Sequence, residues 1–215
     1  MEQKYQDETR RDEAGEERPS RVQQLSTLSE IAGGILVAAS GLALFTVLNE
    51  REFEIVSPFA VLGFFLLVFG LPAYYWSGHH RVGRLAWGSF WAMAVGTVVA
   101  AISLPIAEYG PGVFFIGFLL GLLVTTLGAV GYGITMLRAD VAPKAAAWLL
   151  IAALPVGVPL TIAFTTYVMG EGADPWGGAM VFYGLAWIVF GRYLWNRRTG
   201  DERRIEEPAT EPTVQ

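Results

Sequence analysis

Long apolar segments alternate with short polar segments along most of this chain. Six of them lack charged residues, apart from Arg192 near the end of the last, and cover residues 31–48, 55–76, 85–107, 112–137, 145–169 and 176–195. A helix needs roughly 17 to 25 apolar residues to cross the hydrocarbon core of a bilayer. The pattern therefore predicts an all-α, polytopic integral membrane protein in which six transmembrane helices form a bundle within residues 28–196.

The two ends of the chain differ from this central part. Residues 1–27 and 197–215 are rich in charged side chains, contain proline and hold few large apolar residues. Such segments bury too little apolar surface to offset the entropy lost on ordering. Both are predicted to be disordered tails.

Lysine and arginine fall almost entirely on one side of the predicted topology. With six spans, both tails and the second and fourth loops share one side, and these segments with their flanking turns carry every basic residue except Arg51. Cytoplasmic segments of membrane proteins are enriched in Lys and Arg. We therefore expect both termini to be cytoplasmic, in the cytoplasmic membrane of a cell that the Ala-, Gly- and Val-rich composition suggests is prokaryotic.

Small residues recur at helical spacing in the third and fourth spans. Lipid tails exert little hydrophobic force between helices, so small residues that let backbones approach closely drive their packing. The predicted helix-packing positions are Gly88, Ala92, Gly96 and Ala100 in the third span and Gly117, Gly121 and Gly128 in the fourth. Two interpretations stay open: packing inside one bundle, and association with a second copy or with another membrane subunit.

A weak repeat also runs through the apolar region. Gly70, Gly131 and Gly191 occupy similar places in the second, fourth and sixth spans, and a proline lies near the start of each of these spans. The repeat suggests three tandem helical hairpins. Glycine is common enough in this chain for chance to produce the same matches, so both interpretations stay open.

The fifth span is interrupted by the sequence ALPVGVPLT at residues 153–161. Proline lacks an N–H group, so Pro155 and Pro159 deprive the carbonyls of Ile151 and Pro155 of their helical donors. Interrupted helices at membrane depth are pointers to binding sites in transporters. This predicts a candidate solute-binding site made of Ile151, Pro155, Gly157, Pro159 and Thr161. The alternative is a packed kink, whose freed carbonyls bond to neighbouring helices, water or threonine hydroxyls.

Sequence signatures of catalysis are missing from the chain. It contains no cysteine, which excludes disulfides and thiolate chemistry, and it has no nucleophile-elbow, HExxH or phosphate-loop motif. His79 and His80 are adjacent in a polar loop and cannot share one helical face. The chain thus favours no enzymatic activity, and we expect neither a resident cofactor nor a metal.

Ionisable residues are also missing from the central turns of the six predicted spans. Glu30 precedes the first span, where a helix N-terminus favours an acid, and Glu108 lies at the end of the third, so both are expected to be interfacial. Charged groups at membrane depth mark proton relays and ion coupling. Their absence argues against a proton-coupled pump.

Two functions fit these observations. The first is a non-enzymatic membrane assembly or regulatory subunit that packs in the lipid bilayer against a second copy or another membrane subunit. The second is a small permease or channel-like protein for an uncharged or weakly polar solute, with its site at the broken fifth helix. The chain has a net charge of -5, and no nucleic-acid partner is expected.

Overall fold

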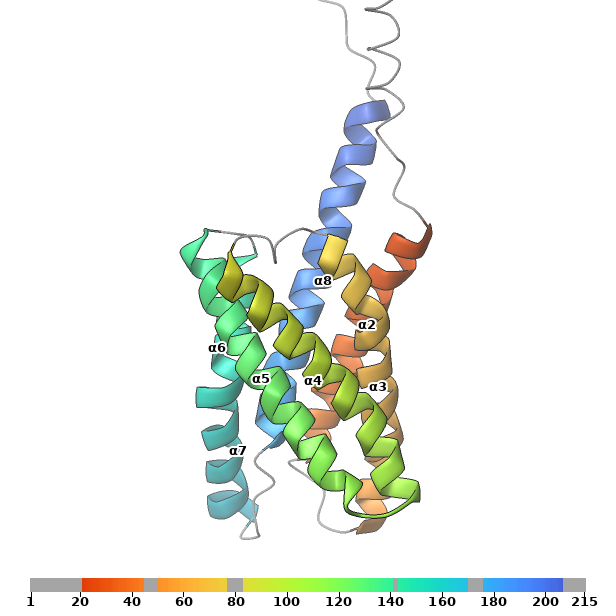
Figure 1. The fold of residues 1–215 in the computed structure, drawn as a ribbon, viewed down its shortest axis with the longest axis vertical. Coiled ribbons are helices and arrows are strands. Elements are labelled where there is room, and N and C mark those ends of the chain that lie inside the picture. Colours follow the sequence, from red (N-terminus) through yellow and green to blue (C-terminus); the bar gives the residue numbers. More distant parts are fainter. Residues whose placement is uncertain (1–20, 45–49, 77–82, 141–142, 170–175, 207–215) are drawn as a thin grey trace, which may run out of the picture.

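The computed structural model describes residues 21–44, 50–76, 83–140, 143–169 and 176–206 (Figure 1). These residues are helical apart from short connections, and no strand occurs among them. The helices are α2 (Arg21–Leu44), α3 (Glu50–Trp76), α4 (Arg84–Tyr109), α5 (Phe114–Arg138), α6 (Lys144–Ala152), α7 (Val158–Phe164) and α8 (Trp176–Glu206), with π-helical turns η2 (Ala153–Gly157) and η3 (Thr165–Met169). The segment from α6 to η3 is one continuous fifth span.

Six helical segments within the described residues are long and apolar enough to cross a membrane. They correspond to the six stretches predicted from the sequence, and the expected all-α architecture is confirmed. The fold is therefore the one expected of a multi-pass membrane protein.

The first and last helices are longer than predicted. α2 begins at Arg21 instead of residue 31, so residues 21–27 are helical and do not belong to a disordered tail. α8 continues to Glu206 and projects beyond the other helices in Figure 1. Residues 1–20 and 207–215 of the predicted tails lie outside the described residues.

The early start of α2 follows from the spacing of its side chains. Val22, Leu25 and Leu28 are exposed on one face, as lipid-facing residues are, while Ser26 and Thr27 are buried on the other. Serine and threonine can satisfy their hydroxyls within a helix or across to its neighbour. The polar face of these first turns is therefore packed against protein.

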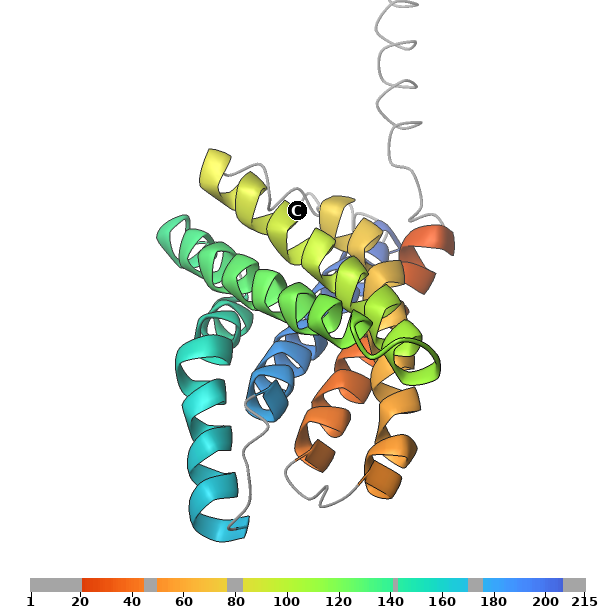
Figure 2. The same cartoon turned by 60° about the horizontal axis from the view of Figure 1, so that its bottom comes forward.

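The helices form a closed ring in chain order. α2 packs against α3 and α8, α4 against α3 and α5, and the fifth span against α5 and α8. α2 begins and α8 ends at the same end of the bundle, at the top of Figure 1, which is called the terminal end below. The fifth span lies at the edge of the ring (Figure 2) and is the least buried of the six.

Glycine sets the spacing between α2 and α8. Gly34 faces Gly184 and Gly41 faces Gly177. Residue numbers increase along α2 where they decrease along α8, so the two helices are antiparallel. At these positions each backbone lies where a larger residue would place its side chain. Close approach of backbones is the main source of helix association in lipid.

α4 and α5 meet through a second seam of small residues. Gly96 packs on Gly121, which in turn packs on Ala100. Gly88, predicted as a packing position, does not belong to the seam, because it is exposed and no atom lies within 4 Å of the place a Cβ would take. A strict four-residue spacing drifts around a helix of 3.6 residues per turn. Ser89 therefore takes the seam position in its place, against α5.

The other predicted packing positions differ in how closely they are packed. Gly117 contacts the Ser103 side chain, and Gly128 contacts the backbone of Met93. Ala92 is only half-buried. The seam therefore runs along most of α5 and includes the predicted Gly96 and Ala100 of α4, but not Gly88.

Aromatic side chains fill the middle of the ring. Tyr74 stacks on Phe90 with ring centroids 5.4 Å apart and contacts Phe190 at 4.3 Å and both Tyr132 and Trp187 at 5.2 Å. The five rings come from α3, α4, α5 and α8. Each ring buries roughly 150–250 Å², so this cluster is the core that holds the non-adjacent helices together.

Candidate functional site

The two prolines of the fifth span face outward. η2 places an extra residue in the turn, which relieves the clash between a proline ring and the carbonyl four residues earlier. Pro155 and Pro159 are exposed, whereas Gly157 and Thr161 are buried. The break therefore directs its proline rings away from the bundle.

Gly157 and Thr161 form a close contact with α8. The Thr161 hydroxyl donates to the Gly157 carbonyl at 2.9 Å and accepts a hydrogen bond from the backbone N–H of Gly178 at 2.6 Å. A Cβ at Gly157 would lie 2.7 Å from the backbone nitrogen of Ala179. The hydroxyl is thus bonded to both helices, and the backbone of α8 fills the space beside Gly157.

The five residues predicted as a solute-binding site do not converge on one space. Ile151 packs against Gly133 of α5, the two prolines face outward, and the remaining two residues face α8. This geometry favours the packed-kink interpretation of the break.

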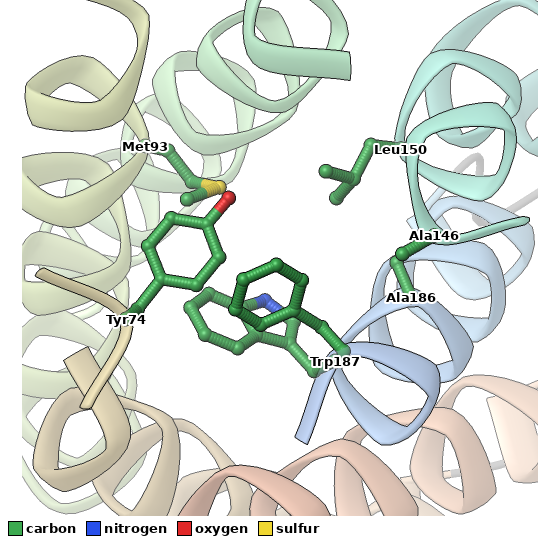
Figure 3. Close-up of a pocket in the computed structure, with 7 residues that line it drawn as sticks. Tyr74, Met93, Ala146, Leu150, Ala186 and Trp187 are labelled. Atoms are coloured by element: carbon green, nitrogen blue, oxygen red, sulfur yellow. The ribbon is translucent and has the colours of Figure 1, made fainter. Parts of the chain in front are cut away.

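A small cavity lies in the aromatic core, beside the α6 part of the fifth span. Side chains from α3, α4, α6 and α8 converge on it (Figure 3), and its lining is Tyr74, Met93, Ala146, Leu150, Ala186, Trp187 and Phe190. Its volume is about 10 Å³, which is room for roughly one water molecule. Small-molecule sites usually occupy roughly 300–1,000 Å³, so this cavity is far too small for a metabolite.

Polar groups are buried in the same core. Thr97 donates to the Met93 carbonyl at 2.8 Å, so its oxygen, 2.9 Å from the Tyr183 hydroxyl, accepts a hydrogen bond from that tyrosine. Among the described residues, the Tyr132 hydroxyl and the Trp187 indole N–H have no hydrogen-bond partner. These groups lie against other rings of the core, not in an open polar channel.

The structure also places an acid where the sequence predicted none. Glu30 lies more than two turns after the start of α2, roughly 13 Å along the axis at about 1.5 Å per residue, and its side chain is 0% exposed. It lies between Gly70 of α3 and Gly191 of α8. The sequence analysis expected Glu30 at the membrane interface, and the structure adds that its side chain is enclosed within the helical bundle.

Glu30 faces a polar neighbour on α3. Tyr74 lies one turn beyond Gly70 on that helix, with its hydroxyl within electrostatic range of the Glu30 carboxyl group. Tyr74 also belongs to the aromatic core.

One turn before the buried acid, Ser26 is inserted into the hydrogen bonds of α3. Its hydroxyl donates to the Phe69 carbonyl at 2.8 Å, and its oxygen accepts from the Ala73 N–H at 3.0 Å. The neighbouring Pro72 lacks an N–H, which already loosens α3 there. The Ser26 hydroxyl thus makes α2 and α3 share hydrogen bonds beside Pro72.

The sequence does carry a signal for the buried acid. In RVQQLSTLSE, at residues 21–30, apolar residues recur three apart and polar residues occupy the opposite face. The uncharged stretch itself begins at Ile31, so it marks only the later part of this helix. The sequence does not say which helices would supply the glycines that make room for Glu30.

Other residues of interest contribute no site. No group of three or more His, Asp and Glu side chains within the described residues could hold a metal ion. His79 and His80 lie outside those residues, as does the side chain of Glu108. The described part of the chain thus offers one feature inside the bundle that combines a buried acid with neighbours from two other helices, the Glu30 site.

Comparison of the chain with protein-family models, with curated proteins and with solved structures gives no match. Its function is therefore argued from the arrangement of its own residues.

Proposed function

We propose that this protein is a non-enzymatic integral membrane subunit that acts by packing, in the assembly or regulation of a membrane complex. The observation that carries the proposal is the contact of Thr161 and Gly157 with α8. It fills the break that would have been the solute site. The fifth span is thus packed against α8 on one face, and it lies at the periphery of the bundle.

The proposed setting is the cytoplasmic membrane of a prokaryote, with both termini in the cytoplasm. Support comes from the distribution of Lys and Arg, which spares the opposite side except for Arg51. Three tandem hairpins remain part of the proposal. They are supported by the contacts between α2 and α3, between α4 and α5, and between the fifth span and α8.

The permease alternative has weaker support. A permease needs a polar, water-accessible space at membrane depth, and the described cavity is apolar and holds about 10 Å³. It also lies beside Leu150 and Ala146, not at Gly157. The partner is therefore proposed to be another membrane-spanning chain, or a second copy of this one, and not a solute.

Reconstitution into liposomes tests the proposal. Vesicles with the purified full chain should release glycerol and urea no faster than protein-free vesicles. A fluorophore on Gly112→Cys, in an exposed connection, then reports the number of copies per complex by photobleaching in native membranes. An assembly subunit should bleach in more than one step or co-diffuse with a second labelled membrane protein. Saturable solute release by monomeric protein would overturn the proposal.

A further inference from the structure

We propose that Glu30 is a proton-binding site within the membrane-spanning bundle, and that its protonation is coupled to the packing of α2 against α3 and α8. The inference does not depend on the assembly role. Its ligand is a proton, and occupation by a small monovalent cation is an outcome that the experiment distinguishes.

On α2 and α3, the outer surface near the level of Glu30 carries apolar side chains. Leu28 on α2 and Phe69 on α3 lie near this level and are 47% and 65% exposed. Glu30 contacts Gly191 of α8, and Trp195 lies one turn, or about 6 Å, closer to the terminal end. Tryptophan marks the membrane interface. Glu30 is therefore about one turn deeper in the bundle than this marker, and its side chain is buried in protein.

The Glu30 side chain has little room to move. Its Cβ lies 3.4 Å from the place that a Cβ at Gly191 would take, and its Cγ lies closer still to the corresponding place at Gly70. Acidic and basic side chains near helix ends usually extend toward the water at the interface. Here two helices enclose the side chain, so Glu30 must gain or lose its proton in place unless the helices separate.

The charged and titratable groups around Glu30 come from three helices. On α3 the titratable group near Glu30 is Tyr74. On α8, Arg192 and Tyr193 follow Gly191, and Arg192 is exposed. On α2, Arg21 is exposed at the start of the helix. Both arginines are thus at the surface of the bundle, whereas the carboxyl group is buried.

A change of charge at Glu30 would be felt by the neighbouring helices. An ionised carboxyl group in an apolar environment loses much of its hydration energy, and binding a proton removes that cost. Glu30 lies one turn from Ser26, whose hydroxyl is bonded into the backbone of α3 beside Pro72. Protonation would therefore favour tight packing of α2 on α3, and deprotonation would favour a looser junction.

Infrared spectroscopy tests proton binding directly. The full chain in lipid nanodiscs, carrying His79→Gln and His80→Gln to remove imidazole titration, is compared at mildly acidic and mildly alkaline pH. We expect a carbonyl band of a protonated carboxylic acid that titrates in this range and is lost in Glu30→Gln. Glu54→Gln, which removes an exposed acid of α3, should leave the band unchanged.

The coupling is tested with spin labels at Leu28→Cys and Phe69→Cys, two exposed positions of a chain without cysteine. The distance between labels should increase at alkaline pH and become independent of pH in Glu30→Gln. If Glu30→Gln fails to fold, Glu30→Asp is compared with the Glu30-containing protein over the same pH range. Glu30→Asp is expected to keep the carboxylic-acid carbonyl band at a shifted frequency.

Three results would overturn the inference. The first is the absence of a titrating band in the Glu30-containing protein, and the second is a band that survives in folded Glu30→Gln. The third is a band abolished by sodium at constant pH, which would assign the site to a metal cation and not a proton. If the band titrates but the distance between the spin labels does not change with pH, the coupling between protonation and helix packing is overturned.

Discussion

Gly34 of α2 and Gly184 of α8 meet backbone to backbone. A Cβ at Gly34 would lie 2.7 Å from the carbonyl oxygen of Gly184, and a Cβ at Gly184 would lie 2.5 Å from the carbonyl oxygen of Gly34. The first and last helices are thus in close contact although they are far apart in sequence. Because α2 also packs on α3, this contact closes the ring of helices.

A branched residue at Gly34 should weaken the bundle. Gly34→Val is expected to lower the free energy of unfolding in lipid bicelles by about 1–3 kcal/mol, because the extra carbons overlap the α8 backbone. Gly88→Val is the matched control, because no atom lies within 4 Å of its Cβ position. The control should change stability by no more than about 0.5 kcal/mol. Equal losses in the two variants would contradict the close contact between α2 and α8.

The sequence predicts the number of helices better than their contacts. Membrane thickness imposes a length on every span, so apolar runs reveal the six spans whatever their partners. Contacts depend on which face each helix presents, and a spacing of four does not define a face over several turns. Gly88 therefore has the spacing of a seam residue, but the seam runs through Ser89.

The candidate site shows a different limit. Proline signals where the fifth span breaks, but the sequence does not reveal that the Thr161 hydroxyl closes the break against Gly178. Glu30 precedes the uncharged stretch of α2, because the amphipathic first part of this helix contains charged and polar residues. Such an acid becomes recognisable only when Gly70 and Gly191 are seen to make room for it.

The topology can be tested with single cysteines, since the chain has none of its own. Gly112 lies in the connection between α4 and α5, and Ala145 lies in the first turn of α6 at the other end of the bundle, both exposed. In intact cells an impermeant maleimide should label Gly112→Cys and should label Ala145→Cys only after permeabilisation. The reverse pattern would place the termini outside the cell.

The connection between α5 and α6 carries an exposed ion pair. Lys144 Nζ lies 2.6 Å from Asp140 Oδ1, and this hydrogen bond and charge hold the pKa of Asp140 below its usual value. The pair therefore contributes stability above the unfolded pKa of about 3.9, and the contribution is lost as pH falls through the lower folded pKa. Lys144→Met should raise the Asp140 pKa toward its usual value.

Carbon-13 NMR of labelled aspartate measures this shift, and added salt should reduce the difference between the two proteins. Unfolding free energy at neutral pH should change little, because exposed ion pairs are weak. Ser29→Ala, at a half-buried position of α2, is the control and should leave the Asp140 titration unchanged. An Asp140 pKa that is the same with and without Lys144 would contradict the ion pair.

Thr161 provides the sharpest test of the broken fifth span. Thr161→Val keeps the shape of the side chain but removes a hydroxyl that bonds both the Gly157 carbonyl and the Gly178 N–H. The Gly178 N–H would then be buried without this acceptor, which should cost about 1–3 kcal/mol of unfolding free energy. Thr161→Ser should restore most of that loss, while Thr166→Val, at an exposed position of η3, should cost much less. If Thr161→Val leaves stability unchanged but creates or alters solute flux in liposomes, the hydroxyl belongs to a transport site and the packing interpretation fails.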